Sequence, residues 1–205
     1  MIKIIQWFFK VFLKLNYGII SVYSKIIVYV LFYVHKVEHK AFVTKGVPRV
    51  FVSSKGSFKI GNNFKMNNVY WANPIGREKK CLFVVGEGAN LMIGENVGVS
   101  FVSIVCRLEI KIGNNVKIGG NVCIYDTDFH SLNFLYRRIK KQDNKETKNK
   151  PVKINDDVFI GAHSIILKGV EIGEKSIIGA GSVVSKSVPK GEIWAGNPAK
   201  FIRNI

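Results

Sequence analysis

The sequence predicts an all-β solenoid: a parallel β-helix with a helical N-terminal segment and one protruding loop. The main observation is an aliphatic residue at every sixth position, at Ile112, Ile118, Ile124, Ile154, Ile160, Ile166, Ile172, Ile178 and Val184. Glycine follows it at Gly113, Gly119, Gly161, Gly173 and Gly179, and a small or β-branched residue recurs four positions on. A period of six fits neither an amphipathic helix nor a simple alternating strand, and such self-similarity is typical of stacked repeats.

Each hexapeptide is expected to form one short strand and one turn. Its aliphatic side chain points inward, and glycine permits the bend in the backbone. Three such units make one triangular coil, and coils stack about 4.8 Å apart, so each isoleucine lies above its counterpart one coil earlier. The alternative is chance alternation in an antiparallel sandwich. Consecutive hexapeptides that keep their aliphatic residue at the same position of the repeat argue against this alternative.

Three regions are predicted along the chain. Residues 1–45 form an apolar helical segment, residues 46–192 form the β-helix, and residues 193–205 form a C-terminal tail. A polar, basic insert at 131–151 interrupts the repeat, yet Ile124 and Ile154 are thirty residues apart, a multiple of six. The solenoid should therefore resume in register after the insert. Long loops in compact domains are usually functional lids or binding loops, or else disordered.

The chain is strongly basic, with 31 Lys and Arg against 14 Asp and Glu and a net charge of +17. Such a field favours anionic partners. No nucleic-acid motif accompanies it, so no nucleic-acid partner is expected. Cys81, Cys106 and Cys123 form an odd set without metal-site spacing. A reducing, cytoplasmic location with the thiols packed as small apolar groups is the simplest interpretation.

The N-terminal segment leaves two alternatives open. Residues 2–15 are mostly apolar, with Lys3, Gln6, Lys10 and Lys14 at helical spacing, and the apolar stretch 19–34 is interrupted by polar residues. Neither stretch reaches the roughly 20 uninterrupted apolar residues of a membrane span, and no secretory cleavage site follows. Residues 1–34 lie either peripherally on the acidic inner face of the cytoplasmic membrane, or packed on the β-helix or a neighbouring subunit.

His130 is the candidate catalytic residue. It lies at the exit of a coil and opens the long insert. Free imidazole titrates near pH 6.5, and acyl transfer to a hydroxyl needs such a base. The alternative is a surface histidine that caps a loop. Asp126 and Asp128 flank it; each could accept a hydrogen bond from His130, bind a substrate hydroxyl, or satisfy backbone N–H groups of a turn.

No metal site is expected. His35 and His39 share a predicted helix face without a third ligand and should be solvated, and His163 should line a subunit seam. Small residues at Gly161, Ala162, Gly179 and Ala180, with cations toward the C-terminus, suit a linear phosphorylated cofactor lying in a groove. A solvated charged face is the alternative for the basic clusters.

Residues 86–205 resemble the hexapeptide-repeat acyltransferases, above all sugar O-acetyltransferases of polysaccharide clusters and maltose and galactoside acetyltransferases. The resemblance is carried by the segments 118–130, 158–163, 178–186 and 195–200. It implies a left-handed coil, a homotrimer with sites at the seams, and acetyl-CoA as donor. It places the base at His130, the pantetheine beside the backbone of Ala162 and Ala180, and the CoA phosphates near Ser185, Lys186, Lys200 and Arg203.

One position departs from the galactoside pattern. Those enzymes carry asparagine one coil before the base, where this chain has Val99 and Ser100. A different acceptor pocket is therefore expected, shaped by Ser100, Trp71 and Arg77.

The expected function is acetyl transfer to a sugar hydroxyl in capsule, O-antigen or exopolysaccharide synthesis. The alternatives are an N-acetyltransferase acting on an amino sugar or antibiotic, a metal-dependent hydratase of the carbonic anhydrase kind, and a non-catalytic membrane-associated scaffold.

Overall fold

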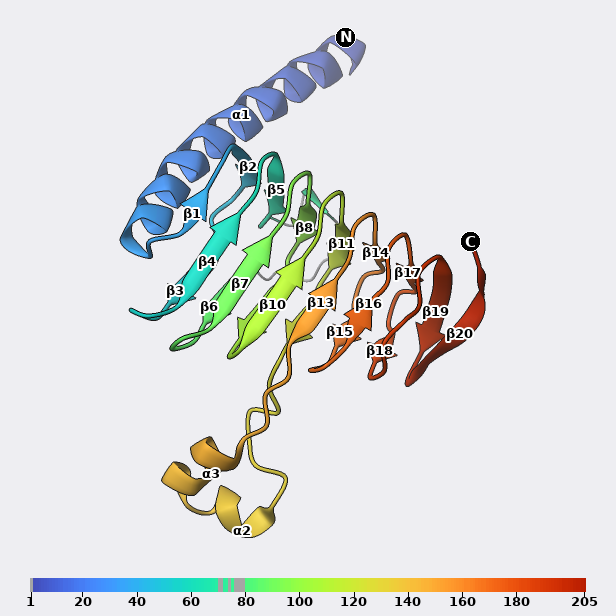
Figure 1. Cartoon of the computed structure of the whole chain (residues 1–205). Coiled ribbons are helices and arrows are strands. Elements are labelled where there is room, and N and C mark those ends of the chain that lie inside the picture. Colours follow the sequence, from blue (N-terminus) through green and yellow to red (C-terminus); the bar gives the residue numbers. More distant parts are fainter. Residues whose placement is uncertain (1, 70–71, 74, 76–79) are drawn as a thin grey trace.

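The computed structural model describes residues 2–69, 72, 73, 75 and 80–205. Three parallel sheets wrap around one core, and the coils stack from the N-terminal helix toward the C-terminus (Figure 1). One sheet contains β1 (Glu38–His39), β4 (Ser57–Ile60), β7 (Asn90–Ile93), β10 (Glu109–Ile112), β13 (Val152–Ile154) and β16 (Glu171–Ile172). A second contains β2 (Phe42–Lys45), β5 (Phe64–Asn67), β8 (Gly98–Ser100), β11 (Lys117–Gly120), β14 (Phe159–Ile160), β17 (Ile177–Ile178), β19 (Glu192–Gly196) and β20 (Ala199–Asn204). The third contains β3 (Arg49–Val52), β6 (Leu82–Val85), β9 (Ser103–Cys106), β12 (Cys123–Tyr125), β15 (Ile165–Ile166) and β18 (Val183–Val184).

The register confirms the predicted stacking of the repeat. Up to β18, parallel partners are three strands apart in sequence, so three strands complete one coil. Ile154 pairs with Ile112 on one side and with Ile172 on the other. The pairing of Ile112 with Ile154 spans the insert, so the solenoid resumes in register as the spacing predicted.

The core is a column of side chains from all three sheets. Ile110, Ile124, Ile160 and Ile178 are fully buried. The N-terminal coils use larger side chains, such as Phe58, Phe64 and Phe83, which are buried in the same column. The hexapeptide pattern is therefore less regular there, although the coil itself continues.

The N-terminal helix α1 (Ile2–Val34) ends well before the predicted boundary at residue 45. Both β1 and β2 precede Gly46, and β2 alternates between buried and exposed positions as a strand with one inward face does. The β-helix thus begins earlier than predicted. His39 lies on β1 and not on a helix, and its ring packs 5.3 Å from those of Phe32 and Phe42, so the expectation of a solvated histidine is wrong.

The C-terminal tail is not irregular. β19 pairs with β17 in parallel, and β20 folds back on β19 as an antiparallel strand. This hairpin extends the second sheet and ends the stack. Residues 193–205 therefore belong to the sheet structure.

The insert leaves one corner of the solenoid and carries two short helices, α2 (Phe134–Arg137) and α3 (Lys140–Glu146) (Figure 1). A single bridge between Thr127 and Asn149 closes its base. Around it, the amide of Asp128 donates to Lys148 O (3.1 Å), and that of Lys150 donates to Asp126 O (2.9 Å). The insert is therefore a folded arm on a short two-stranded stem.

Candidate active site

The site is built around His130, which follows the stem and stands at the start of the arm. Its Nδ1 lies 2.7 Å from Oδ2 of Asp143 on α3. The other oxygen of Asp143 accepts the backbone N–H of Ser131 at 2.7 Å. A carboxylate only accepts hydrogen bonds, so in the neutral form of the imidazole the contact favours the tautomer with the proton on Nδ1 and the lone pair on Nε2. The pair has the geometry of a base oriented by a carboxylate.

The two partners differ sharply in exposure. The side chain of His130 is 68% exposed, while that of Asp143 is 10% exposed. The pKa of Asp143 is lowered, first by its hydrogen bond with His130 and then by the Ser131 N–H. Asp143 therefore stays ionised as a fixed acceptor, and His130 presents its ring outward.

The arm is folded so that Asp143 can reach back. Arg137 Nη1 donates to the carbonyls of Ser131 (2.7 Å) and Leu132 (2.9 Å), which ties α2 to the start of the arm. Thr147 Oγ1 donates to Asp143 O at 2.7 Å and closes the end of α3. These contacts support the fold of the arm that brings Asp143 to His130.

The carboxylate was not predicted from the sequence, which pointed to Asp126 or Asp128 as the partner of His130. Asp126 is fully buried and accepts the N–H groups of Arg107 (2.7 Å), Leu108 and Glu109 (both 2.8 Å). It holds the turn of the preceding coil, which was one of the alternatives. The available signal was that Asp143 and Glu146 are the acidic residues of a basic insert.

Asp128 and Ser100 also have partners within the chain. Asp128 Oδ1 forms an ion pair with Lys168 (3.2 Å), while its Oδ2 is buried without a hydrogen-bond partner among the described residues. Ser100 is buried, and its hydroxyl accepts from Asn67 Nδ2 one coil earlier at 3.1 Å. Neither contact reaches His130. Trp71 and Arg77 lie outside the described residues.

The small residues stack at one corner of successive coils. A Cβ on Gly119 would lie 2.6 Å from Ala162 N, and one on Gly161 would lie 2.8 Å from Ala180 Cα. One on Gly179 would lie 2.8 Å from the Cβ of Ala195. These glycines are therefore required by coil stacking. Gly161 is buried, whereas Ala162 is half-buried and Ala180 is exposed at the surface of the corner.

The predicted phosphate-binding residues lie toward the C-terminal end of the stack. Ser185, Lys186, Lys200 and Arg203 are all exposed. Lys200 lies opposite Ala195, and Arg203 opposite Ile193, in the terminal hairpin. The amide of Gly181 donates to Ala162 O (2.8 Å), which places the corner residues of adjacent coils side by side. The chain thus offers small residues along a corner and cations near its end.

A polar cavity of about 340 Å³ lies at the base of the arm. Two earlier turns, the stem, and α3 with its C-cap line it: Glu87, Arg107, Thr127, Phe129, Asn144, Thr147 and Asn149. Phe129, which directly precedes His130 in the chain, is one of the residues that line this cavity.

Two of the three cysteines, Cys81 and Cys106, are poor nucleophiles. Burial raises the pKa of Cys81 to about 12. Burial, together with the carboxylate of Asp126, also raises the pKa of Cys106. Both thiols stay protonated at neutral pH and pack as small apolar groups. Within the described part of the chain, no group of three His, Cys, Asp or Glu side chains could hold a metal ion.

Known proteins share this repeat. A family described as "Hexapeptide repeat of succinyl-transferase" matches residues 151–186. The crystal structure of the hexapeptide-repeat containing acetyltransferase VCA0836 from Vibrio cholerae superposes with a TM-score of 0.56 at 30% identity, covering 70% of this chain and 72% of that one. This chain belongs to the hexapeptide-repeat acyltransferases. Its coil is accordingly the left-handed β-helix that the resemblance implied.

Other hexapeptide-repeat acyltransferases extend the comparison. Galactoside O-acetyltransferase of Escherichia coli (strain K12) is 39% identical over 119 residues, which is 58% of this chain and 56% of that protein. The chain spans only 56% and 61% of the length of the first two curated relatives. A mutant form of AntD, an N-acyltransferase from Bacillus cereus, has a TM-score of 0.62 at 24% identity with 82% of both chains covered, and shares the fold.

Proposed function

We propose that this hexapeptide-repeat acyltransferase transfers acetyl from acetyl-CoA to a sugar hydroxyl, in the synthesis of a surface polysaccharide. The observation that carries the proposal is the 2.7 Å contact between His130 Nδ1 and Asp143 Oδ2 at the start of the arm. A histidine so oriented has Nε2 available as a general base. The named activity of the galactoside O-acetyltransferase relative supports acetyl transfer to a sugar.

His130 would act in both halves of the reaction. Its Nε2 takes the proton of the acceptor hydroxyl as the oxygen attacks the carbonyl carbon of the thioester. Asp143 stabilises the imidazolium that forms, since its carboxylate already accepts from Nδ1. When the C–S bond breaks, the imidazolium returns the proton to the leaving thiolate. A backbone N–H at the coil edge would stabilise the oxyanion.

The donor would lie along the corner of small residues. Ala162 and Ala180 leave room beside the backbone for a pantetheine arm, and Gly161 and Gly179 keep the coils close enough to form that edge. Lys186, Lys200 and Arg203 supply positive charge for the CoA phosphates at the C-terminal end. The acetyltransferase activity named for the galactoside and Vibrio cholerae relatives supports an acetyl donor here as well.

A second copy of the chain would complete the site. One chain leaves the His130 side chain 68% exposed, whereas acyl transfer is favoured by a site that excludes water. A homotrimer with His130 at each seam would enclose the ring between two protomers. The cytoplasm suits both the acetyl-CoA donor and three cysteines that are free thiols.

The test is thiol release from acetyl-CoA across a panel of sugars and amino sugars. His130→Ala should lose at least about a hundredfold in turnover, while CoA still raises the melting temperature. His130→Gln keeps a similar size and hydrogen-bonding capacity and should lose as much. Unchanged thiol release in either variant would reject His130 as the base. Preference for amines over hydroxyls would instead indicate N-acyl transfer, and no CoA stabilisation in the wild type would favour a scaffold.

A further inference from the structure

Helix α1 has two unlike sides, and the inward side is already occupied. In its C-terminal half, Ser24, Val28 and Phe32 are buried against the first coils, and Ser21 Oγ donates to Thr44 O at 3.3 Å. Continuing this stripe toward the N-terminus at helical spacing leads to Lys3, Gln6 and Lys10. The same side of α1 therefore presents lysines in its N-terminal half and packs against the β-helix in its C-terminal half.

The opposite side is apolar along the whole helix and faces outward. Residues at spacings of three and four form one line there, and the members with the largest exposed side chains are Ile4, Phe8, Ile19, Val22, Ile26, Val30 and Tyr33. Their exposed fractions run from 58% for Val30 to 86% for Tyr33. At 1.5 Å per residue the line from Ile4 to Tyr33 is about 44 Å long. It is far longer than the isolated apolar patches normal for a soluble surface.

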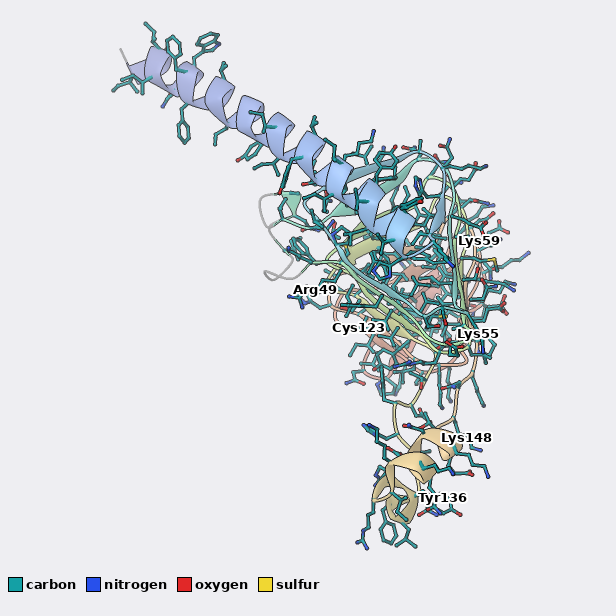
Figure 2. The ribbon with its side chains drawn as sticks, turned by 90° about the vertical axis from the view of Figure 1, so that its left-hand side faces the viewer. Arg49, Lys55, Lys59, Cys123, Tyr136 and Lys148 are labelled. Atoms are coloured by element: carbon teal, nitrogen blue, oxygen red, sulfur yellow. The ribbon has the colours of Figure 1, made fainter. Side chains whose placement is uncertain are left out.

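The N-terminal half of α1 extends beyond the body of the β-helix (Figure 2). Both views place it on the side away from the arm that carries His130 (Figures 1 and 2). Whatever covers the apolar line therefore leaves the arm accessible.

Charge selects the occupant. Residues 1–37 contain five lysines and no aspartate or glutamate. A second copy of this helix would cover the apolar line but would offer the lysines no acidic partner, whereas an anionic lipid surface offers both an apolar layer and negative headgroups. Trp7, Tyr23, Tyr29 and Tyr33 are exposed on the same helix, and aromatic side chains of this kind favour the headgroup level of a bilayer.

We propose that α1 lies in the surface of an anionic bilayer, with its apolar line in the acyl layer and its lysines among the headgroups. The helix contains a segment, Tyr17–Val34, long and apolar enough to span a membrane by length and composition. That segment also carries the buried stripe that packs on the β-helix, and a helix fixed to a polar body along its side lies along the bilayer surface. The molecule would thereby be held at a membrane with its arm directed away from it.

Vesicle flotation of the full chain tests this. It should float with vesicles of three parts phosphatidylcholine to one part phosphatidylglycerol, bind weakly to pure phosphatidylcholine, and detach as salt is raised. Phe8→Gln/Ile26→Gln removes two residues of the line that are 62% and 59% exposed, and should weaken partitioning by about tenfold or more. Lys3→Gln/Lys10→Gln should weaken it about thirtyfold on anionic vesicles only.

Matched controls lie on other parts of the surface. Leu132→Gln/Ile205→Gln removes two apolar side chains that are 78% and 63% exposed elsewhere, and Lys140→Gln/Lys141→Gln removes the same charge from the arm. Both controls should float like the wild type. A chain that stays in solution with every vesicle, and whose assembly dissociates in Phe8→Gln/Ile26→Gln, would show that a second copy covers the line. Equal, salt-independent binding to neutral vesicles would also overturn the proposal. Thiol release in solution should be unchanged by the helix variants, so the two proposals fail separately.

Discussion

Replacing Asp143 by asparagine separates the role of this carboxylate from that of His130. The substitution keeps the size of the side chain and leaves one oxygen that can still accept from Ser131 N. In the wild type, Ser131 N lies 2.7 Å from Oδ1 of Asp143. It removes the negative charge from the atom 2.7 Å from His130 Nδ1. The amide NH₂ would then face Nδ1, favour the tautomer protonated on Nε2, and leave that nitrogen unable to accept a proton.

The magnitude follows from the exposure of the ring. In a fully buried triad the same exchange costs about 10⁴ in turnover. In one chain the His130 side chain is 68% exposed, so without a partner subunit water can solvate the imidazolium and the wrong tautomer can convert more easily, and enclosure at the proposed seam would raise the cost only part of the way toward that of a buried triad. We therefore expect a loss of about 10- to 100-fold in kcat, smaller than for His130→Ala, with little change in KM for acetyl-CoA.

The assay is steady-state thiol release between pH 6 and 9 with the best acceptor from the panel. If Asp143 fixes the tautomer, Asp143→Asn should lower kcat across this range and shift its pH profile. Asp143→Glu, which restores the charge, should recover part of the loss. Wild-type turnover of Asp143→Asn at every pH, alongside a deficient His130→Ala, would refute the argument.

The remaining predictions concern the arm, the corner and the donor site. The pKa of Asp143 is lowered in the folded protein, so the stability that its contacts contribute is fully present above the unfolded pKa of about 3.9 and is lost as pH falls through the lower folded pKa. Deuterium exchange should therefore show a protected arm at pH 5 and an open arm only in strong acid. Gly161→Ala should destabilise the coil by about 1–3 kcal/mol in urea unfolding, since its Cβ would lie 2.8 Å from Ala180 Cα. Gly18→Ala, with nothing within 4 Å, should be neutral or stabilising by up to about 1 kcal/mol, and an equal loss in both variants would contradict the stacking argument. Lys186→Gln should raise KM for acetyl-CoA about two- to fivefold with kcat retained, and an unchanged KM would remove this residue from the donor site.

The stack of coils could be predicted because its cause is local and repeated. Ile118, Ile160 and Ile178 occupy equivalent positions, and the same rule of one inward aliphatic side chain and one tight turn holds for each. The first coils were harder to predict because Phe58, Phe64 and Phe83 fill the same column with larger groups. The helix boundary was misplaced for a related reason: β2 is a four-residue strand, too short for a clear period.

The candidate site likewise has one part that the sequence predicted and one part that it did not. His130 could be predicted because it ends a coil and opens the insert, which is a statement about sequence position. Its partner could not, because thirteen residues separate Asp143 from His130 and only the folding of α2 and α3 brings them together. Asp126 and Asp128 were nearer in sequence but are turned toward the preceding turn and toward Lys168.

The sequence by itself therefore determined the solenoid, its register across the insert and the position of the imidazole, because a short-range repeat dictates its own stacking. Only the tertiary structure decided which carboxylate orients His130, why Gly161 cannot carry a side chain, and which side of α1 is left exposed. These features depend on contacts between segments far apart in the chain, and the local sequence pattern contains no record of such contacts.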